Sequence, residues 1–228
     1  MSTNQPVGDA DPRPRAALVD DSTVQRTAFQ AMYPELNVIG TYASVEALLA
    51  AKPRVDVVAL DLRLETALQG PKAIERLTAQ GYRICVYTDE RRILVLAQCF
   101  AAGAFGLARK SAPLAETQRV FIQVASGEQV PPSAMVELAE LLERRDRLPE
   151  LTTRQTEVLS RRARGVAWDT LARQLGISTK TAQEHYKALM AKMVRVIQDA
   201  GLDPDASAAD IEHALGLAPG DLNDPNGR

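Results

Sequence analysis

The sequence predicts a doubly wound α/β domain with a five-stranded parallel sheet, followed by a second, smaller all-α domain. The first half of the chain alternates five short apolar runs with five helical patterns, which is typical of a parallel sheet with helices on both faces. From Leu151 onward the hydrophobic period is helical. Residues 151–200 also carry nine Lys and Arg against four acids, which favours a nucleic-acid-binding module.

In the first half, polar or turn residues bound each apolar run, and a helical pattern follows it. Ser44 is placed as a helix cap and Gly103 as a helix end. Strands are predicted over residues 16–19, 37–42, 55–60, 84–87 and 105–108. Helices are predicted from Ser22, from Ser44, and over residues 71–79, 93–102 and 114–125.

In the second half, Thr152-x-x-Gln155 is a capping-box pattern that opens a helix. Two further helices, over residues 168–175 and from Ser178 to about Ala200, flank Gly176 and predict a helix-turn-helix. The third helix is long, and its extended apolar stripe indicates either core packing against the tail or a dimer seam.

The sequence also predicts where the domains begin and end. The divisions are a disordered lead-in (1–15), the α/β domain (16–127), a linker helix (128–148), the helical domain (149–202) and an acidic tail (203–228) with a possible helix near 208–217. A plain extension of the first domain is an equal alternative for the linker.

Composition favours a cytoplasmic protein that neither spans nor binds a membrane. No apolar run approaches the about 20 residues needed to cross a bilayer. We expect the polar N-terminus to be neither a signal peptide nor an anchor. Cys85 and Cys99 lie in apolar segments and are expected to be buried free thiols rather than a disulfide or a metal site.

Polar side chains capable of chemistry follow four of the predicted strands. They are Asp20 and Asp21, Asp61, Thr88 and Lys110. The carboxyl ends of parallel strands share one edge of a sheet, so we expect these side chains to meet there. Carboxylate oxygens suit Mg²⁺. A carboxylate can also attack phosphorus to give an aspartyl phosphate, while an ammonium neutralises the transferring oxygens.

Residues 16–126 resemble a response-regulator receiver domain. Residues 149–200 resemble the LuxR-type (NarL subfamily) helix-turn-helix, through Leu151-Thr-Thr-Arg-Gln-Thr-Glu-Val-Leu159, Ala163-Arg-Gly165, Leu175-Gly-Ile-Ser178 and Thr181-x-x-x-His185. The resemblance implies a two-component transcription factor of flavodoxin-like receiver fold. The resemblance also implies that the chain is not an enzyme. Its partners would be double-stranded DNA, a histidine kinase or other phosphodonor, and a second copy in a homodimer.

The resemblance also implies residue roles in the receiver. Asp61 would accept the phosphoryl group, Thr88 would be the switch hydroxyl and Lys110 would contact the phosphate. Asp20, Asp21, Asp61 and the backbone carbonyl of Arg63 would bind Mg²⁺.

Four positions depart from the family pattern. Leu107 replaces the usual aromatic residue before the lysine, and Asp89 replaces a small residue after Thr88, where its carboxylate is expected to crowd and repel an incoming phosphate. Glu65 stands where a proline is usual, and Gly70 comes one residue late. The metal and acceptor residues are therefore intact, while the loops around them are altered.

The third helix of the helix-turn-helix is expected to enter the major groove. Lys180, Gln183 and Lys187 are predicted to share its exposed face, and Gln183 could pair with adenine. Trp168 is expected to be a half-buried packing residue. The predicted DNA-binding set is Arg154, Lys180, Thr181, Gln183, Lys187 and Lys192.

Two other functions remain open on the sequence alone. Asp89 and Leu107 favour a transcription factor that is independent of phosphorylation and is controlled by a ligand or partner. The acidic tail and Gln183 favour a signalling adaptor that does not bind DNA.

Overall fold

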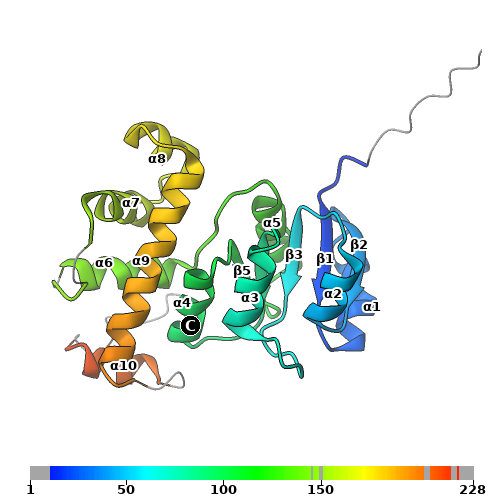
Figure 1. The fold of residues 1–228 in the computed structure, drawn as a ribbon, viewed down its shortest axis with the longest axis horizontal. Helices are drawn as coiled ribbons and strands as arrows, with labels where there is room; N and C mark the ends of the chain where they lie inside the picture. The colour runs from blue at the N-terminus through cyan, green and yellow to red at the C-terminus, as the bar shows by residue number, and fades with distance from the viewer. Residues whose placement is uncertain (1–10, 145, 149–150, 203–205, 217–219, 221–228) are drawn as a thin grey trace, which may run out of the picture.

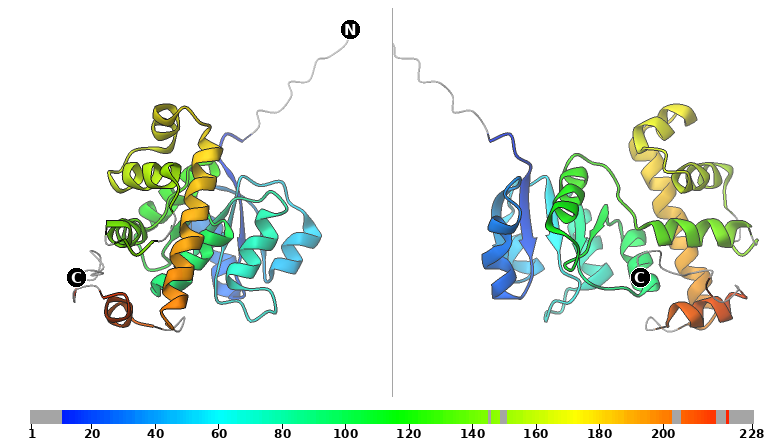
Figure 2. Two further views of the ribbon diagram at one scale, coloured as in Figure 1. Left: turned by 60° about the vertical axis from the view of Figure 1, so that its left-hand side comes forward. Right: turned by 180° about the vertical axis from the view of Figure 1, so that it is seen from behind.

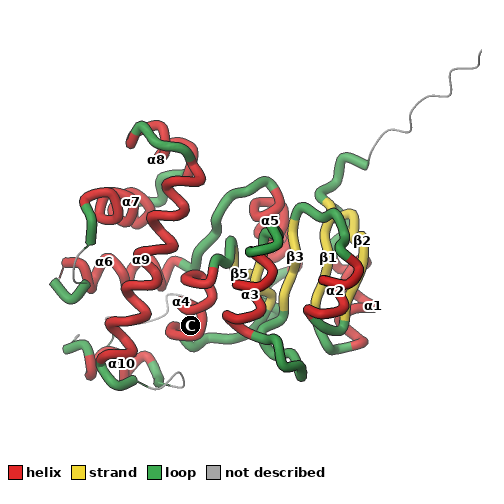
Figure 3. The backbone as a smooth tube through the Cα atoms, in the orientation of Figure 1, coloured by secondary structure: helices red, strands yellow, loops and turns green. Residues whose placement is uncertain are grey.

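The computed structural model describes residues 11–144, 146–148, 151–202, 206–216 and 220. All strands of the described chain lie in one half of the molecule, and the other half is built from helices (Figures 1 and 3). Most of the predicted lead-in and parts of the predicted tail lie outside the described residues. The proposed domain boundaries stay a prediction.

The sheet has five parallel strands in the order β2-β1-β3-β4-β5, as the alternating sequence pattern predicts. Each strand is short because the apolar run that forms it is short. The strands are β1 (Arg15–Val19), β2 (Asn37–Tyr42), β3 (Val57–Leu60), β4 (Ile84–Tyr87) and β5 (Gly106–Ala108).

Helices cover both faces of this sheet. Alternate strand residues point to opposite faces, so Leu18 of β1 joins the core under α1 (Thr23–Met32) and α5 (Leu114–Ala125). Val19 joins the core on the other face. That face is covered by α2 (Val45–Ala51), α3 (Gly70–Thr78) and α4 (Ile93–Ala102). The doubly wound arrangement is therefore confirmed.

An aromatic cluster anchors the end of β4 from the α1–α5 side. Phe29, Tyr33, Tyr87 and Phe121 pack edge to face, with ring centroids 5.0–6.2 Å apart. The hydroxyls of Tyr33 and Tyr87 lie 2.9 Å apart, so the buried phenol groups satisfy each other. Because Tyr87 directly precedes Thr88, this cluster fixes the strand end from which the predicted switch hydroxyl projects.

The helical half comprises α6 (Ser133–Arg144), α7 (Thr153–Ala163), α8 (Trp168–Leu175), α9 (Thr179–Asp199) and α10 (Ala208–Ala214). Thr152 and Gln155 form the predicted capping box at the start of α7. Gly176 ends α8 at φ +66°, a conformation that favours glycine, and turns the chain into α9. Helix α6 packs against α7.

Helix α9 is 21 residues long, and its far end packs within the chain. Met193 and Ile197 are fully buried in the same cluster as Ile211 and Leu215 of the tail segment. This favours core packing over a dimer seam for these residues. In the described part of the chain, no helix is both long enough and apolar enough to span a membrane.

The two halves meet along α4 and α9. These helices pack against each other more extensively than any other helix pair, and all three ribbon views place them side by side (Figures 1 and 2). Helix α4 carries no charged residue, and Leu94, Leu96, Cys99 and Phe100 are almost fully buried in the shared core. A helix that is apolar on every side needs covering on every side, and α9 covers the side that faces away from the sheet.

Candidate functional site

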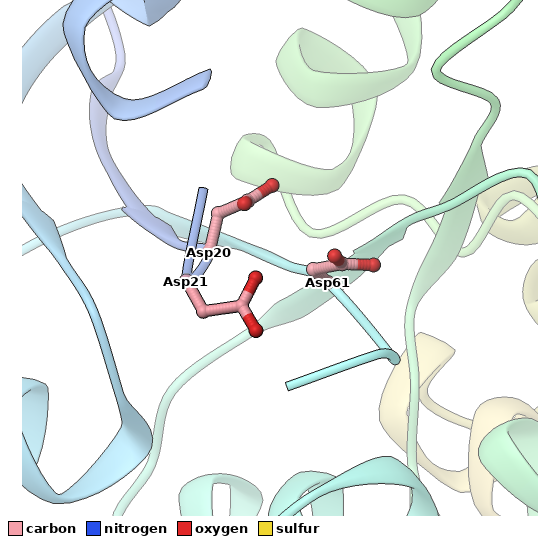
Figure 4. A group of neighbouring side chains, drawn as sticks. All are labelled: Asp20, Asp21 and Asp61. Atoms are coloured by element: carbon pink, nitrogen blue, oxygen red, sulfur yellow. The ribbon is translucent and has the colours of Figure 1, made fainter. Parts of the chain in front are cut away.

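Three carboxylates meet at the carboxyl edge of the sheet, as predicted. Asp20 and Asp21 follow β1, Asp61 follows the neighbouring β3, and one oxygen of each lies within 4.8 Å of the others (Figure 4). Asp20 is fully buried and Asp61 is 7% exposed. Strand ends anchored in the core hold these carboxylates in a fixed arrangement.

Backbone N–H groups orient each of the three carboxylates. Ser22 donates to Oδ1 of Asp20 at 2.8 Å, and Arg63 donates to Oδ1 of Asp61 at 3.3 Å. Glu65 donates to Oδ2 of Asp21 at 3.0 Å, so the altered loop after Asp61 folds back onto the acidic pair.

Lys110 lies between two of the carboxylates. Its Nζ donates to Oδ2 of Asp20 at 2.7 Å and to Oδ2 of Asp61 at 2.9 Å. Burial alone would lower the pKa of Lys110, but its bonds to both carboxylates outweigh that effect and raise it. The lysine therefore remains a cation, as a group that neutralises phosphoryl oxygens must.

The set of three carboxylates also fits Mg²⁺, which prefers oxygen ligands and binds proteins through one or two carboxylates plus water. Asp20, Asp21 and Asp61 are the residues that would hold it. The Arg63 carbonyl stays a predicted ligand.

Thr88 is 2% exposed, and its Oγ1 accepts the Glu90 N–H at 3.2 Å. The predicted switch hydroxyl is thus engaged with the next loop.

Glu90 fixes the loop after Thr88 through its hydrogen bonds. This role was not predicted from the sequence. Glu90 is 4% exposed and accepts the N–H groups of Arg91 and Arg92, both at 2.9 Å, directly before α4. The Arg92 guanidinium binds both of its oxygens, at 2.9 and 2.6 Å, and Nη2 of Arg63 lies 3.9 Å away. Glu90 therefore fixes the two residues that directly precede α4 and joins them to the loop after Asp61.

We expect Glu90→Gln to lower the free energy of unfolding at pH 7 by about 1–2 kcal/mol. The hydrogen bonds from Arg92 lower the pKa of Glu90 from 4.5 to about 2. A lowered carboxyl pKa stabilises the fold fully above about pH 4.5, and that stabilisation is lost as the pH falls toward 2. Denaturant unfolding between pH 7 and pH 2.5 should show parent and variant converging.

The exposed acid Glu35 provides the matched control for this measurement. It lies just before β2, at the amino-terminal edge of the sheet, whereas Glu90 lies at the carboxyl edge. Glu35→Gln should leave the free energy of unfolding within about 0.5 kcal/mol of the parent at each pH. A constant difference between Glu90→Gln and the parent at every pH would contradict the ion-pair interpretation.

The predicted DNA-reading face of α9 is not fully exposed, which corrects the sequence expectation. Gln183 is only 9% exposed, and its Nε2 donates to the Gly127 carbonyl at 3.0 Å. Lys187 is half-buried, and its Nζ lies close to Gly103. A Cβ atom added to that glycine would be 3.4 Å from the Nζ. Lys180 is exposed. The sequence could not give this result, because the residues that cover Gln183 come from the other half of the chain.

The remaining residues of the predicted DNA-binding set have local partners. Arg154 is exposed and pairs with Glu157 at 2.9 Å. Lys192 donates to Oε1 of the capping residue Gln155 at 3.0 Å. Thr181 donates its N–H at 3.0 Å to the hydroxyl of Ser178, the residue that caps the start of α9. Their contacts with DNA stay predictions.

Trp168 is 2% exposed, so the expectation of a half-buried residue is wrong. Its indole N–H donates to the Gln129 carbonyl at 2.7 Å, across the junction between the two halves. The Arg162 guanidinium lies 4.6 Å from its ring centroid and the Tyr186 ring 5.6 Å away.

Cys85 and Cys99 are buried free thiols, as predicted, and burial raises the pKa of both.

Comparison with known proteins yields one family match and several relatives. Residues 149–196 match the family described as bacterial regulatory proteins, luxR family. The probable transcriptional regulatory protein SgaR of Hyphomicrobium methylovorum is 31% identical over 185 residues, which cover 78% of this chain and 85% of that protein. The transcriptional regulatory protein UhpA of Escherichia coli (strain K12) is 28% identical over 183 residues, covering 78% and 90%.

Solved structures share the overall fold. The RcsB response regulator of Salmonella typhimurium matches with a TM-score of 0.50 at 18% identity, over 90% of this chain and 99% of that one. An RcsB–DNA complex matches with a TM-score of 0.51 at 19% identity, over 90% and 98%. At this identity the likeness shows the fold, with a receiver followed by a helix-turn-helix.

Proposed function

Because this chain belongs to the LuxR-type family of bacterial transcriptional regulatory proteins, we propose that Mg²⁺-dependent phosphorylation of Asp61 controls its binding to double-stranded DNA. The observation that carries this proposal is the joint placement of the three carboxylates, Thr88 and Lys110 on one sheet edge. A partner histidine kinase or a small phosphodonor would supply the phosphoryl group in the cytoplasm.

The chemistry of the site follows from its geometry. An Asp61 oxygen attacks the donor phosphorus, a new P–O bond forms, and the donor's own bond to phosphorus breaks with its electron pair leaving on the donor. Bound Mg²⁺ supplies charge neutralisation for the transferring oxygens. Lys110, already 2.9 Å from Asp61, and the hydroxyl of Thr88 then contact the phosphoryl oxygens.

We further propose that the described arrangement is a resting state. Gln183 and Lys187 cannot read a major groove while they lie against Gly127 and Gly103, so DNA binding requires α9 to leave α4. Separation would uncover the apolar surface of α4. A homodimer of the active form would cover such a surface again.

One observation favours control by a small molecule as a second candidate. A crevice of about 970 Å³ lies between α9 and the ends of α3 and α4, within the size range of ligand sites. Its lining includes Arg83, Lys180 and Lys187. A ligand there would hold the two halves together without phosphorylation.

The direct test is DNA binding with and without an acyl phosphate donor and Mg²⁺. Gel shifts of the full chain on genomic fragments should show specific complexes, and the donor should raise the apparent affinity about tenfold, because the phosphorylated form has α9 exposed. Specific binding that never responds to the donor would favour the ligand-controlled candidate. The absence of specific complexes under both conditions would favour the adaptor.

A further inference from the structure

The loop that carries Lys110 is tied to the loop after Thr88 on both sides of the lysine. Ser111, directly after Lys110, donates its N–H to Oδ1 of Asp89 at 2.8 Å. Arg109, directly before it, donates Nη1 to the Glu90 carbonyl at 3.1 Å. The two loops are therefore joined at adjacent residues.

Lys110 needs such support because its own strand offers little. Strand β5 has three residues and lies at the edge of the sheet, where it pairs with β4. Past Ala108 the chain leaves the strand, and the Arg109 carbonyl accepts the Thr117 hydroxyl from α5 and the Ala112 N–H of its own turn, each at 3.2 Å. The long lysine side chain has many rotamers, so the backbone below it must be fixed if Nζ is to stay between Asp20 and Asp61.

We propose that Asp89 is a positioning residue for Lys110, acting through the N–H of Ser111, and this rests on the proposed phosphorylation of Asp61. Asp89 is exposed and holds the lysine loop with its carboxylate. The departure from a small residue at this position then supports phosphate uptake rather than obstructing it, in contrast to the crowding and repulsion expected from the sequence.

The two interpretations of Asp89 predict changes of opposite sign. Crowding predicts that Asp89→Ala takes up phosphate faster than the parent, because bulk and charge are removed together. Positioning predicts that Asp89→Ala takes up phosphate more slowly, because the Ser111 N–H loses its acceptor. Asp89→Asn separates charge from hydrogen bonding, since its amide oxygen still accepts the Ser111 N–H while the charge is gone.

The experiment measures the initial rate of phosphate uptake from an acyl phosphate with Mg²⁺, by intact mass of the full chain. Asp89→Ala should be about tenfold slower at saturating donor, since a displaced catalytic group reduces the rate of the chemical step. Asp89→Asn should stay within about twofold of the parent, because the acceptor for Ser111 remains. Glu35→Ala, which removes an exposed acid at the opposite edge, should have no effect. Faster uptake in both Asp89 variants would overturn the proposal.

Amide hydrogen exchange gives a readout independent of phosphorylation. Exchange at the Ser111 N–H should accelerate in Asp89→Ala and stay at the parent rate in Asp89→Asn. Unchanged exchange in Asp89→Ala would overturn the positioning role even if uptake slowed. A parent that takes up no phosphate, with Ser111 exchange behaving as expected, would instead refute the phosphorylation of Asp61 and leave the loop contact established.

Discussion

Asp61→Asn should abolish phosphate uptake completely in a full-length protein that otherwise folds and binds DNA like the unphosphorylated parent. An amide lacks the anionic oxygen that attacks phosphorus, and it also removes one of the three carboxylates that would hold Mg²⁺. The parent, treated with an acyl phosphate and Mg²⁺, should gain the mass of one phosphoryl group. Intact mass spectrometry of both proteins over a time course checks this.

The control for this variant lies at the other end of the same strand. Asp56 directly precedes β3 and pairs with Arg15 at 3.1 Å, far from the carboxyl edge of the sheet. Asp56→Asn should still take up one phosphoryl group. A phosphorylated Asp61→Asn protein would place the acceptor elsewhere and would remove Asp61 from the mechanism.

The sequence predicted the sheet edge well because its signals are local. A buried strand is followed by Asp61, another by Thr88, and parallel topology alone brings strand ends together. Helix starts such as Ser44 and the Thr152–Gln155 capping box are likewise encoded within a few residues. These predictions needed no knowledge of how distant segments pack.

The contacts between the two halves were not predictable in this way. The α9 sequence places Gln183, Lys187, Met190 and Val194 on one stripe, at spacings of four, three and four, yet only the last two are apolar. That pattern gives no reason to expect Gln183 to be buried, because its cover is the Gly127 carbonyl from a distant turn. Trp168 was misjudged for the same reason, since its acceptor is the Gln129 carbonyl.

A substitution at the contact between α4 and α9 should have the second large effect, on DNA affinity. Unphosphorylated Ala101→Arg should bind DNA about tenfold more tightly than the unphosphorylated parent, if the closed form outnumbers the open form by at least about ten to one. Ala101 is half-buried on α4 and lines the crevice shared with Lys180 and Lys187. Arginine is a good helix former, and a cation suits the last turn of α4, so the receiver should stay folded. Its bulk should instead push α9 away, while its charge meets both the lysines and the acids Glu75 and Glu184 of the same crevice.

Intrinsic fluorescence reports the same opening without DNA. Trp168 is the single tryptophan of the chain, and it is buried at the junction with its N–H bonded to Gln129. Opening should expose the indole and shift its emission to longer wavelength. Ala101→Glu provides the matched control for charge. Because both lysines and acids line the crevice, a similar bulk with negative charge should open the junction to a similar extent if bulk is the cause. If Ala101→Arg changed neither the emission nor the DNA affinity, the α4–α9 contact could not be what withholds α9 from DNA.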